Sequence, residues 1–240
     1  MIFCYKIIFS YDGSMFFGSA KQPNLNCVQN RFNEALKTIG VFSEALFASR
    51  TDKGVHALCN VACIKSVYKL NLTFAKNKLN KILDGIYIKS IKEVSSNFEV
   101  RFDVKTRAYR YIISNNFNAF NKKYLCYYDK KINIKLLKQA LNILQNEYDF
   151  SSFSLSNDKK NKIRKMYKCR IYNYKDYTVI NFFANGFLRG QIRLIVDFLL
   201  KINENKLSLE DFKQQLLNIK THSRTLANAG GLYLKSVSYI

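Results

Sequence analysis

The stretch "FASRTDKGVHALCNVACIKSV", residues 47–67, joins a basic turn to an apolar segment. "TDKG" is a turn signal, because aspartate bonds its own backbone and glycine supplies unusual dihedral angles. The residues from Ala57 to Val67 are apolar and β-branched enough to predict a strand. Asp52 is the one carboxylate of the turn, with Arg50 and Lys53 on either side. A turn alone would explain the aspartate, but its basic neighbours point to chemistry as well.

Strands and helices alternate on both sides of this stretch, which predicts an α+β fold. Gly40 and Gly85 are expected to end the two helices of the first half. We expect two similar α+β units, residues 1–104 and 105–240. The expected strands are 2–9, 57–67, 86–94, 106–114, 166–174, 177–184 and 230–240, and the expected helices begin near 28, 72, 134, 188 and 208.

Charge is the strongest property of the whole chain. Among 240 residues, 39 are Lys or Arg and 17 are Asp or Glu, a formal net charge of +22. Such a chain attracts polyanions, because neutralised phosphates release condensed counterions. A biased genome is the alternative explanation. An anionic membrane surface is less favoured, because no helix is basic on one face and apolar on the other.

The composition and the cysteines narrow the class further. A hydrophobic fraction of 48% is typical of a globular protein. No apolar run reaches the length of about 18 residues that a membrane span needs, and the start of the chain is expected to be a strand, so we expect a cytoplasmic protein. His56, Cys59 and Cys63 could suggest zinc, but strand alternation places His56 on the opposite face. We therefore expect buried thiols.

Asp52 is expected to stay ionised, because a neighbouring arginine favours the charged form of a carboxylate. That state suits a nucleophile or an electrostatic stabiliser and does not suit a general acid. A metal-dependent nuclease would need several converging carboxylates, which the sequence does not offer.

A second segment, "VKTRAYRYIIS", combines aromatic and basic residues. In a strand, Arg107, Tyr109 and Tyr111 share one face. Tyrosine beside arginine suits base stacking with phosphate contact. The alternative is an ordinary edge strand.

The third segment is "FFANGFLRGQIRLIV". A helix from about Leu188 to Ile202 would place Arg189 and Arg193 on one face, with Gly190 inside it at a cost of about 1 kcal/mol. The cost indicates close packing or a close approach. A solvated helix face is the alternative reading of the two arginines.

Taken together, these segments resemble the tRNA pseudouridine synthase A family. The resemblance runs in order from about residue 5 to 239, and six motifs recurring in sequence make chance agreement very improbable. The matching stretches are "YDGSMFFG", "CVQNRFNEAL", "SRTDKGVHA", "RAYRY", "NGFLRGQIRLIV" and "GLYLKSVSY".

The resemblance implies a fold and an activity. The fold would be the pseudouridine synthase α+β fold, with two pseudo-symmetric halves whose mixed, mainly antiparallel sheets are flanked by helices around a basic cleft. The activity would be isomerisation of uridine to pseudouridine at positions 38, 39 and 40 of the tRNA anticodon stem-loop. Family members use no metal and no organic cofactor, and bacterial members act as homodimers. No DNA or membrane partner is expected.

The resemblance also implies roles for five residues. Asp52 matches the catalytic aspartate, and whether it attacks C1′ or first abstracts a C2′ proton stays open. Arg50 matches the arginine that fills the space of the flipped-out nucleotide, a step that costs a few kcal/mol of unstacking. Tyr109 matches the tyrosine stacked on the uracil, and Arg193 the arginine paired with the aspartate. Leu234 is expected to line the pocket.

Some positions depart from the family pattern and leave RNA contacts and helix packing open. A non-catalytic RNA-binding protein that keeps the scaffold is the rival function, and a metal-dependent nuclease comes third. The departures are Ser19 and Ala20 for Trp-Gln, Ser49 for Gly, Lys53 for Ala, Arg189-Gly190 for a His-His or Trp-Arg pair, and Asp197 for a small residue.

Overall fold

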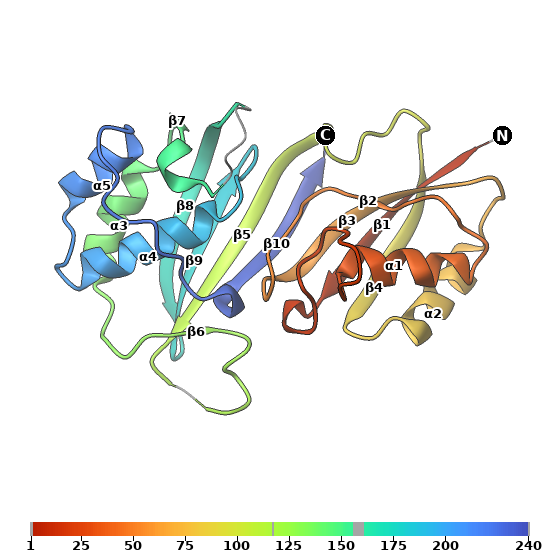
Figure 1. Cartoon of the computed structure of the whole chain (residues 1–240), viewed down its shortest axis with the longest axis horizontal. Helices are drawn as coiled ribbons and strands as arrows, with labels where there is room; N and C mark the ends of the chain where they lie inside the picture. Colours follow the sequence, from red (N-terminus) through yellow and green to blue (C-terminus); the bar gives the residue numbers. More distant parts are fainter. Residues whose placement is uncertain (1, 117, 156–160, 240) are drawn as a thin grey trace. The chain divides into compact units, whose positions relative to one another are not determined.

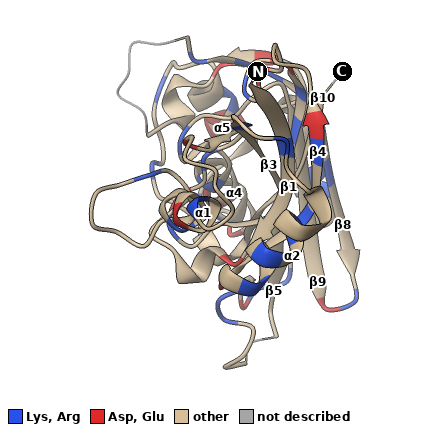
Figure 2. Ribbon diagram, turned by 90° about the vertical axis from the view of Figure 1, so that its right-hand side faces the viewer, with Lys and Arg blue, Asp and Glu red and all other residues tan. Residues whose placement is uncertain are grey.

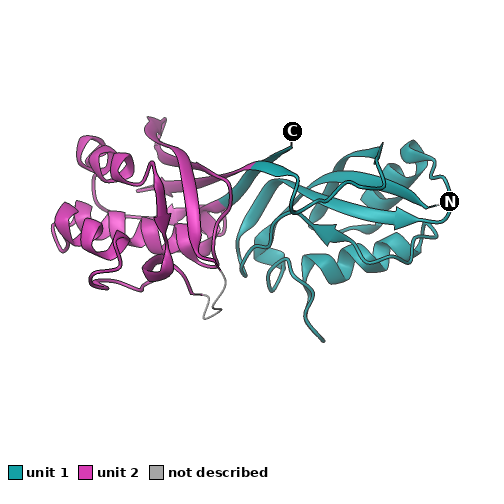
Figure 3. Ribbon diagram, turned by 90° about the horizontal axis from the view of Figure 1, so that it is seen from above, with its two compact units in different colours: residues 1–105, 233–240 teal, residues 106–232 magenta. Residues whose placement is uncertain are grey.

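The computed structural model describes residues 2–116, 118–155 and 161–239. The chain forms two compact units, coloured separately in Figure 3. Unit 1 consists of Met1–Lys105 and Tyr233–Ile240, and unit 2 of Thr106–Leu232. This division differs from the expected halves, 1–104 and 105–240, because the last strand pairs within the sheet of unit 1.

Unit 1 is built on a mixed sheet with the strand order β4-β1-β3-β10. Strand β10 runs parallel to β3, with Leu234 opposite Ala57, whereas β1 runs antiparallel to both β3 and β4. The short strand β2 pairs with β3. The strands are β1 (Phe3–Tyr11), β2 (Leu46–Phe47), β3 (His56–Ser66), β4 (Ile86–Val94) and β10 (Leu232–Tyr239).

Two helices, α1 (Val28–Lys37) and α2 (Leu72–Ile82), lie along the sheet of unit 1 in Figure 1. Phe32 of α1 packs against Phe9 and Phe47, with ring centroids 5.0 and 5.5 Å away, and all three rings are buried. A second hydrophobic cluster joins strand residues of this sheet to residues of the 95–103 segment. That cluster contains Ala48, Val61, Cys63, Phe98, Val100, Val237 and Tyr239.

The sequence predicts that Gly40 and Gly85 end the helices α1 and α2. Gly40 follows α1 with φ +77°, and its N–H donates to the Lys37 carbonyl, so its role as the terminating residue is confirmed. Gly85 follows α2 with φ +71°. In α2, Ala75 and Leu79 are buried, whereas Ile82 at its end is 42% exposed.

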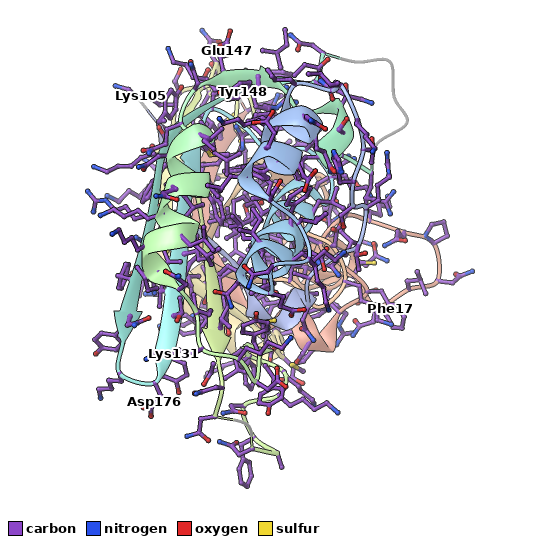
Figure 4. The ribbon with its side chains drawn as sticks, turned by 90° about the vertical axis from the view of Figure 1, so that its left-hand side faces the viewer. Phe17, Lys105, Lys131, Glu147, Tyr148 and Asp176 are labelled. Carbon is purple, nitrogen blue, oxygen red and sulfur yellow. The ribbon has the colours of Figure 1, made fainter. Side chains whose placement is uncertain are left out.

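Unit 2 has a sheet with the order β5-β9-β8-β7 and antiparallel neighbours throughout. The short β6 pairs parallel to β5. Strands β8 and β9 form a hairpin whose turn is Lys175 and Asp176, the latter labelled in Figure 4. The strands are β5 (Val104–Ser114), β6 (Cys126–Tyr127), β7 (Glu147–Asp149), β8 (Ile163–Tyr174) and β9 (Tyr177–Ala184).

Three helices complete unit 2: α3 (Ile134–Ile143), α4 (Gln191–Asn203) and α5 (Leu209–Leu216). Phe153, Phe198 and Phe212 are fully buried and meet edge to face, with centroids 5.2 to 5.9 Å apart. Helix α5 starts with a capping box, in which Ser208 and Asp211 bond each other's backbone. The mixed, mainly antiparallel α+β class predicted for the chain is therefore confirmed.

Helix α4 corrects the prediction for residues 188–202. It begins at Gln191, and Gly190 precedes it with φ +73°, in the left-handed region. Arg189 therefore lies before the helix and does not share a helical face with Arg193. The apolar face of α4, with Ile192, Ile195, Val196 and Leu199, is buried. A helix cannot pass through a left-handed residue, and helical spacing alone does not reveal that.

Helix length also bears on membranes. Within residues 2–116, 118–155 and 161–239, no helix combines the length and the apolar character needed to cross a bilayer.

Gly190 and Gly40 provide a matched test of this backbone. Both have positive φ, but an added Cβ at Gly190 would lie 2.8 Å from Leu155, whereas Gly40 has nothing within 4 Å. Gly40→Ala should cost about 1–2 kcal/mol of unfolding free energy from strain alone. Gly190→Ala should cost about 1–3 kcal/mol more, because Leu155 must shift. Urea unfolding measures both, and equal losses would contradict the described packing at Gly190.

Candidate active site

Asp52 opens the tight turn that leads into β3. The N–H of Val55 donates to the Asp52 carbonyl at 3.1 Å, and Gly54 adopts φ +78°. A positive φ at the third position of a turn favours glycine. Asp52 is half-buried and Arg50 is exposed. The turn predicted from "TDKG" is therefore present.

The segment that follows β1 braces this turn. Thr51 and Ser19 bond twice: the Thr51 N–H donates to Ser19 Oγ at 2.7 Å, and the Ser19 N–H donates to the Thr51 carbonyl at 3.0 Å. The Tyr11 hydroxyl bonds Thr51 Oγ1 at 2.8 Å. Burial raises the pKa of Tyr11 to about 12, against the opposing effect of the Thr51 bond. Tyr11 therefore stays a neutral hydrogen-bond partner and does not serve as a base near neutral pH.

Two glycines allow the close approach of these segments. A Cβ on Gly13 would overlap the Val55 carbonyl, and Gly18, with φ +96°, would place one 3.1 Å from the Thr51 oxygen. Both belong to the stretch "YDGSMFFG". The spacing of these glycines is the sequence signal that could have indicated a backbone contact with the turn.

His56 has a role that the sequence did not reveal. It is buried, its Nδ1 lies 3.0 Å from the Gly13 N–H, and its ring stacks on Tyr233 with centroids 4.7 Å apart. Since Nδ1 accepts from Gly13, we assign the neutral Nε2–H tautomer. The carboxylate of Asp12 lies 3.2 Å from the same nitrogen. His56 links three segments around the turn.

Two buried amides, also not predicted, complete the brace. Asn60 donates to the Ser49 carbonyl at 3.0 Å and accepts from the Val61 N–H at 2.8 Å. Gln29, in the first turn of α1, donates to the Ala45 carbonyl at 2.8 Å. Buried polar groups must find partners, so these amides fix the backbone on both sides of the turn.

Leu234, expected in the pocket, lies in β10 and is fully buried. It pairs with Ala57 in β3, and its neighbour Tyr233 pairs with His56. Unit 1 therefore contains Asp52 at the start of the turn, Arg50 two residues before it, and Leu234 beside the start of the strand that follows.

Tyr109 and Arg193 belong to unit 2. Tyr109 lies in β5, is 6% exposed, and meets the Phe187 ring edge-on at 5.0 Å. Two residues along, the Tyr111 hydroxyl donates to the Asn228 carbonyl at 2.7 Å, and burial raises the pKa of Tyr111 well above its usual value.

Arg193 sits in the first turn of α4 and is fixed by the backbone of the 227–228 segment. Its Nε donates to the Ala227 carbonyl at 2.7 Å, and the Ala227 N–H donates to the Arg193 carbonyl at 3.1 Å. The first bond holds the Nε end of the guanidinium, and the second holds the Arg193 backbone. One turn further, Asp197 forms an ion pair with Lys201 at 2.8 Å and accepts from Ser223, so this departure from the family pattern has a structural role in α4.

No group of three or more His, Cys, Asp or Glu side chains among the described residues could hold a metal ion. The cysteines of the suspected cluster differ in burial: Cys63 is buried in the unit 1 core, where burial raises the pKa of its thiol, and Cys59 is half-buried.

Comparison with known proteins identifies the family. A family model described as tRNA pseudouridine synthase matches residues 140–240. A tRNA pseudouridine synthase A from Campylobacter jejuni subsp. jejuni serotype O:2 is 44% identical over 238 residues, covering 98% of each chain. The tRNA pseudouridine synthase A of Thermosipho melanesiensis is 38% identical, and the match covers 98% of this chain and 99% of that one. The tRNA pseudouridine synthase A of Wolinella succinogenes is 36% identical, and the match covers 95% of this chain and 92% of that one. The chain belongs to the tRNA pseudouridine synthase A family, a family of isomerases.

Proposed function

We propose that this chain is a tRNA pseudouridine synthase that isomerises uridine at positions 38, 39 and 40 of the anticodon stem-loop. The observation that carries the proposal is the family match over nearly the whole chain, together with an aspartate in a turn that is braced from several sides. Such bracing suits catalysis, because a catalytic group has to be held in place before the substrate binds.

The reaction exchanges one bond for another on the same uracil. The glycosidic bond between C1′ and N1 breaks, the uracil turns, and a bond forms between C1′ and C5. C5 then loses its hydrogen as a proton, and N1 gains one. We propose Asp52 as the catalytic group that acts on the ribose, either by attack at C1′ or by removal of the C2′ proton.

Four further residues are proposed to serve the same nucleotide. Arg50, exposed just before the turn, takes the place of the flipped-out uridine in the RNA. Tyr109 stacks on the uracil, with its ring supported edge-on by Phe187. Arg193 stabilises negative charge during the reaction, and Leu234 lines the uracil pocket.

We further propose that the enzyme works in the cytoplasm as a homodimer, on tRNA, with no DNA or membrane partner and no metal or organic cofactor. The charge of +22 supports an RNA partner. In Figure 2, basic residues recur along β4 and α2 of unit 1.

Replacing the catalytic carboxylate is the sharpest test. Asp52→Asn keeps the shape of the side chain but removes its charge, so it should abolish turnover and leave RNA affinity broadly intact. Release of tritium from C5-labelled uracil in an anticodon stem-loop measures turnover, and filter binding measures affinity. Asp176→Asn, at the hairpin tip of unit 2, is the matched control and should keep wild-type turnover. A wild-type protein that binds the RNA tightly yet releases no tritium would support the non-catalytic rival.

Two substitutions of Tyr109 distinguish the contribution of its ring from that of its hydroxyl. Tyr109→Phe should retain capture of the uracil, whereas Tyr109→Ala should weaken it by about 1–3 kcal/mol. Because Tyr109 is buried against Phe187, truncation to Ala also costs about 3–5 kcal/mol of stability, so circular dichroism must show folded protein at the assay temperature. If Phe and Ala reduced kcat/KM equally, the hydroxyl and not the ring would be the working part.

Removal of metal ions distinguishes the proposed synthase from a metal-dependent nuclease. Treatment with EDTA followed by gel filtration should leave tritium release unchanged when the RNA is already folded, because no proposed step uses a metal. A loss of activity that added Mg²⁺ restores, with the stem-loop still intact by native gel, would contradict the proposal.

A further inference from the structure

Lys53, the residue after Asp52, has an unusually close aromatic partner. Its Nζ lies 4.1 Å from the centroid of the Phe17 ring. Two other lysine–ring pairs of unit 1 are looser, with Lys78 Nζ 5.7 Å from Phe74 and Lys6 Nζ 5.3 Å from Tyr239. An ammonium within about 6 Å of a ring face is attracted by the ring's quadrupole. The Phe17 ring therefore holds the charge of Lys53 in place.

Phe17 is itself fixed relative to the catalytic turn. Its N–H donates to the Asn26 carbonyl at 2.9 Å, and its carbonyl accepts from the Gln22 side chain at 2.9 Å. The next residue, Gly18, lies against the Thr51–Lys53 backbone, closely enough that an added Cβ would be 3.1 to 3.5 Å from it. The ring, labelled in Figure 4, nevertheless belongs to a residue that is 45% exposed.

The charge of Lys53 is oriented but not neutralised. Lys21 and Lys201 pair with carboxylates at 3.3 and 2.8 Å. For Lys53, by contrast, the described part of the chain provides the Phe17 ring and no carboxylate within ion-pair distance. Lys53 is also exposed. An exposed cation that is held by an uncharged ring is suited to an anionic ligand.

We propose that Lys53, positioned by Phe17, binds a backbone phosphate that flanks the target uridine. The proposal rests on the proposed function, because Asp52 marks where the target ribose binds. The Cα atoms of Asp52 and Lys53 are about 3.8 Å apart, since they are consecutive residues. Lysine stands here where alanine is usual in the family pattern, so this contact would be an addition of this chain. In this role Lys53 is a binding residue and Phe17 a positioning residue.

Salt dependence of RNA binding tests the phosphate contact. The probe is a synthetic anticodon stem-loop, titrated at several salt concentrations. Lys53→Ala should lower affinity at low salt about 5- to 10-fold and reduce the slope of log affinity against log salt by about 0.7–0.9, the value for one phosphate. Lys53→Arg should restore most of both, and in turnover Lys53→Ala should raise KM more than it lowers kcat. Lys78→Ala removes an equal charge from another lysine–ring pair and is the control. An unchanged slope, or an equal loss in Lys78→Ala, would overturn the proposal.

Two further measurements locate the contact. Phe17→Leu should weaken RNA binding in the presence of Lys53 and have no added effect in its absence, because the ring acts through the ammonium. A neutral methylphosphonate can replace either of the two phosphates that flank the uridine. At one of these positions, the replacement should weaken binding of the stem-loop to the wild-type protein. The same replacement should not weaken binding to Lys53→Ala. The proposal would be overturned if the effects of Phe17→Leu and Lys53→Ala on RNA affinity were additive in the double variant. It would also be overturned if methylphosphonate at either position weakened RNA binding to Lys53→Ala as much as to wild type.

Failure of this inference can be distinguished from failure of the proposed function. Binding measurements do not require turnover, so RNA binding with a normal Lys53 effect but no tritium release would count against the proposed function alone. Wild-type turnover with no change in Lys53→Ala would count against the phosphate contact alone.

Discussion

The close contact between the segment after β1 and the turn before β3 is the constraint on which the site of unit 1 depends. Here two stretches of backbone approach so closely that Gly13 and Gly18 cannot carry a Cβ without displacing their neighbours. The paired bonds of Ser19 and Thr51 then fix the register between them. As a result, the position of Asp52 is set by backbone on two sides. It does not depend on the rotamers of its own loop.

The bracing residues are neutral, although the chain around them is strongly charged. Tyr11 keeps its proton because it is buried, His56 accepts a backbone N–H, and Asn60 uses both ends of its amide. Buried neutral groups can hold the loop without the desolvation penalty that a buried ion would bring. The charged residues nearby, Arg50 and Lys53, are exposed. Buried neutral side chains thus support the turn, whereas exposed charged side chains are available to attract RNA.

Much of the fold could be predicted from the sequence, because apolar spacing and glycine stops are local signals. Helix α1 with its stop at Gly40 and the strand that follows the Asp52 turn are where they were expected, whereas the short strand β2 before the turn was not expected. The start of α4 could not be predicted, since helical spacing continues through Gly190 and does not report its left-handed backbone. The turn around Asp52 was predictable, but the partners that brace it were not. His56 and Asn60 are bonded by residues distant in the sequence, and no periodicity encodes such pairing.

The parallel pairing of β10 with β3 has a consequence for how the chain acquires its structure. The ribosome makes the first 105 residues, then all of unit 2, and only afterwards the strand that completes the sheet of unit 1. Unit 2 is continuous in sequence, so it can form its hydrophobic core while unit 1 still lacks strand β10. Pairings between residues so distant along the chain form slowly, because a large loop must close first. The nascent first unit therefore exposes the open edge of β3 throughout the synthesis of the second, and this is the interval in which a chaperone would have most to protect.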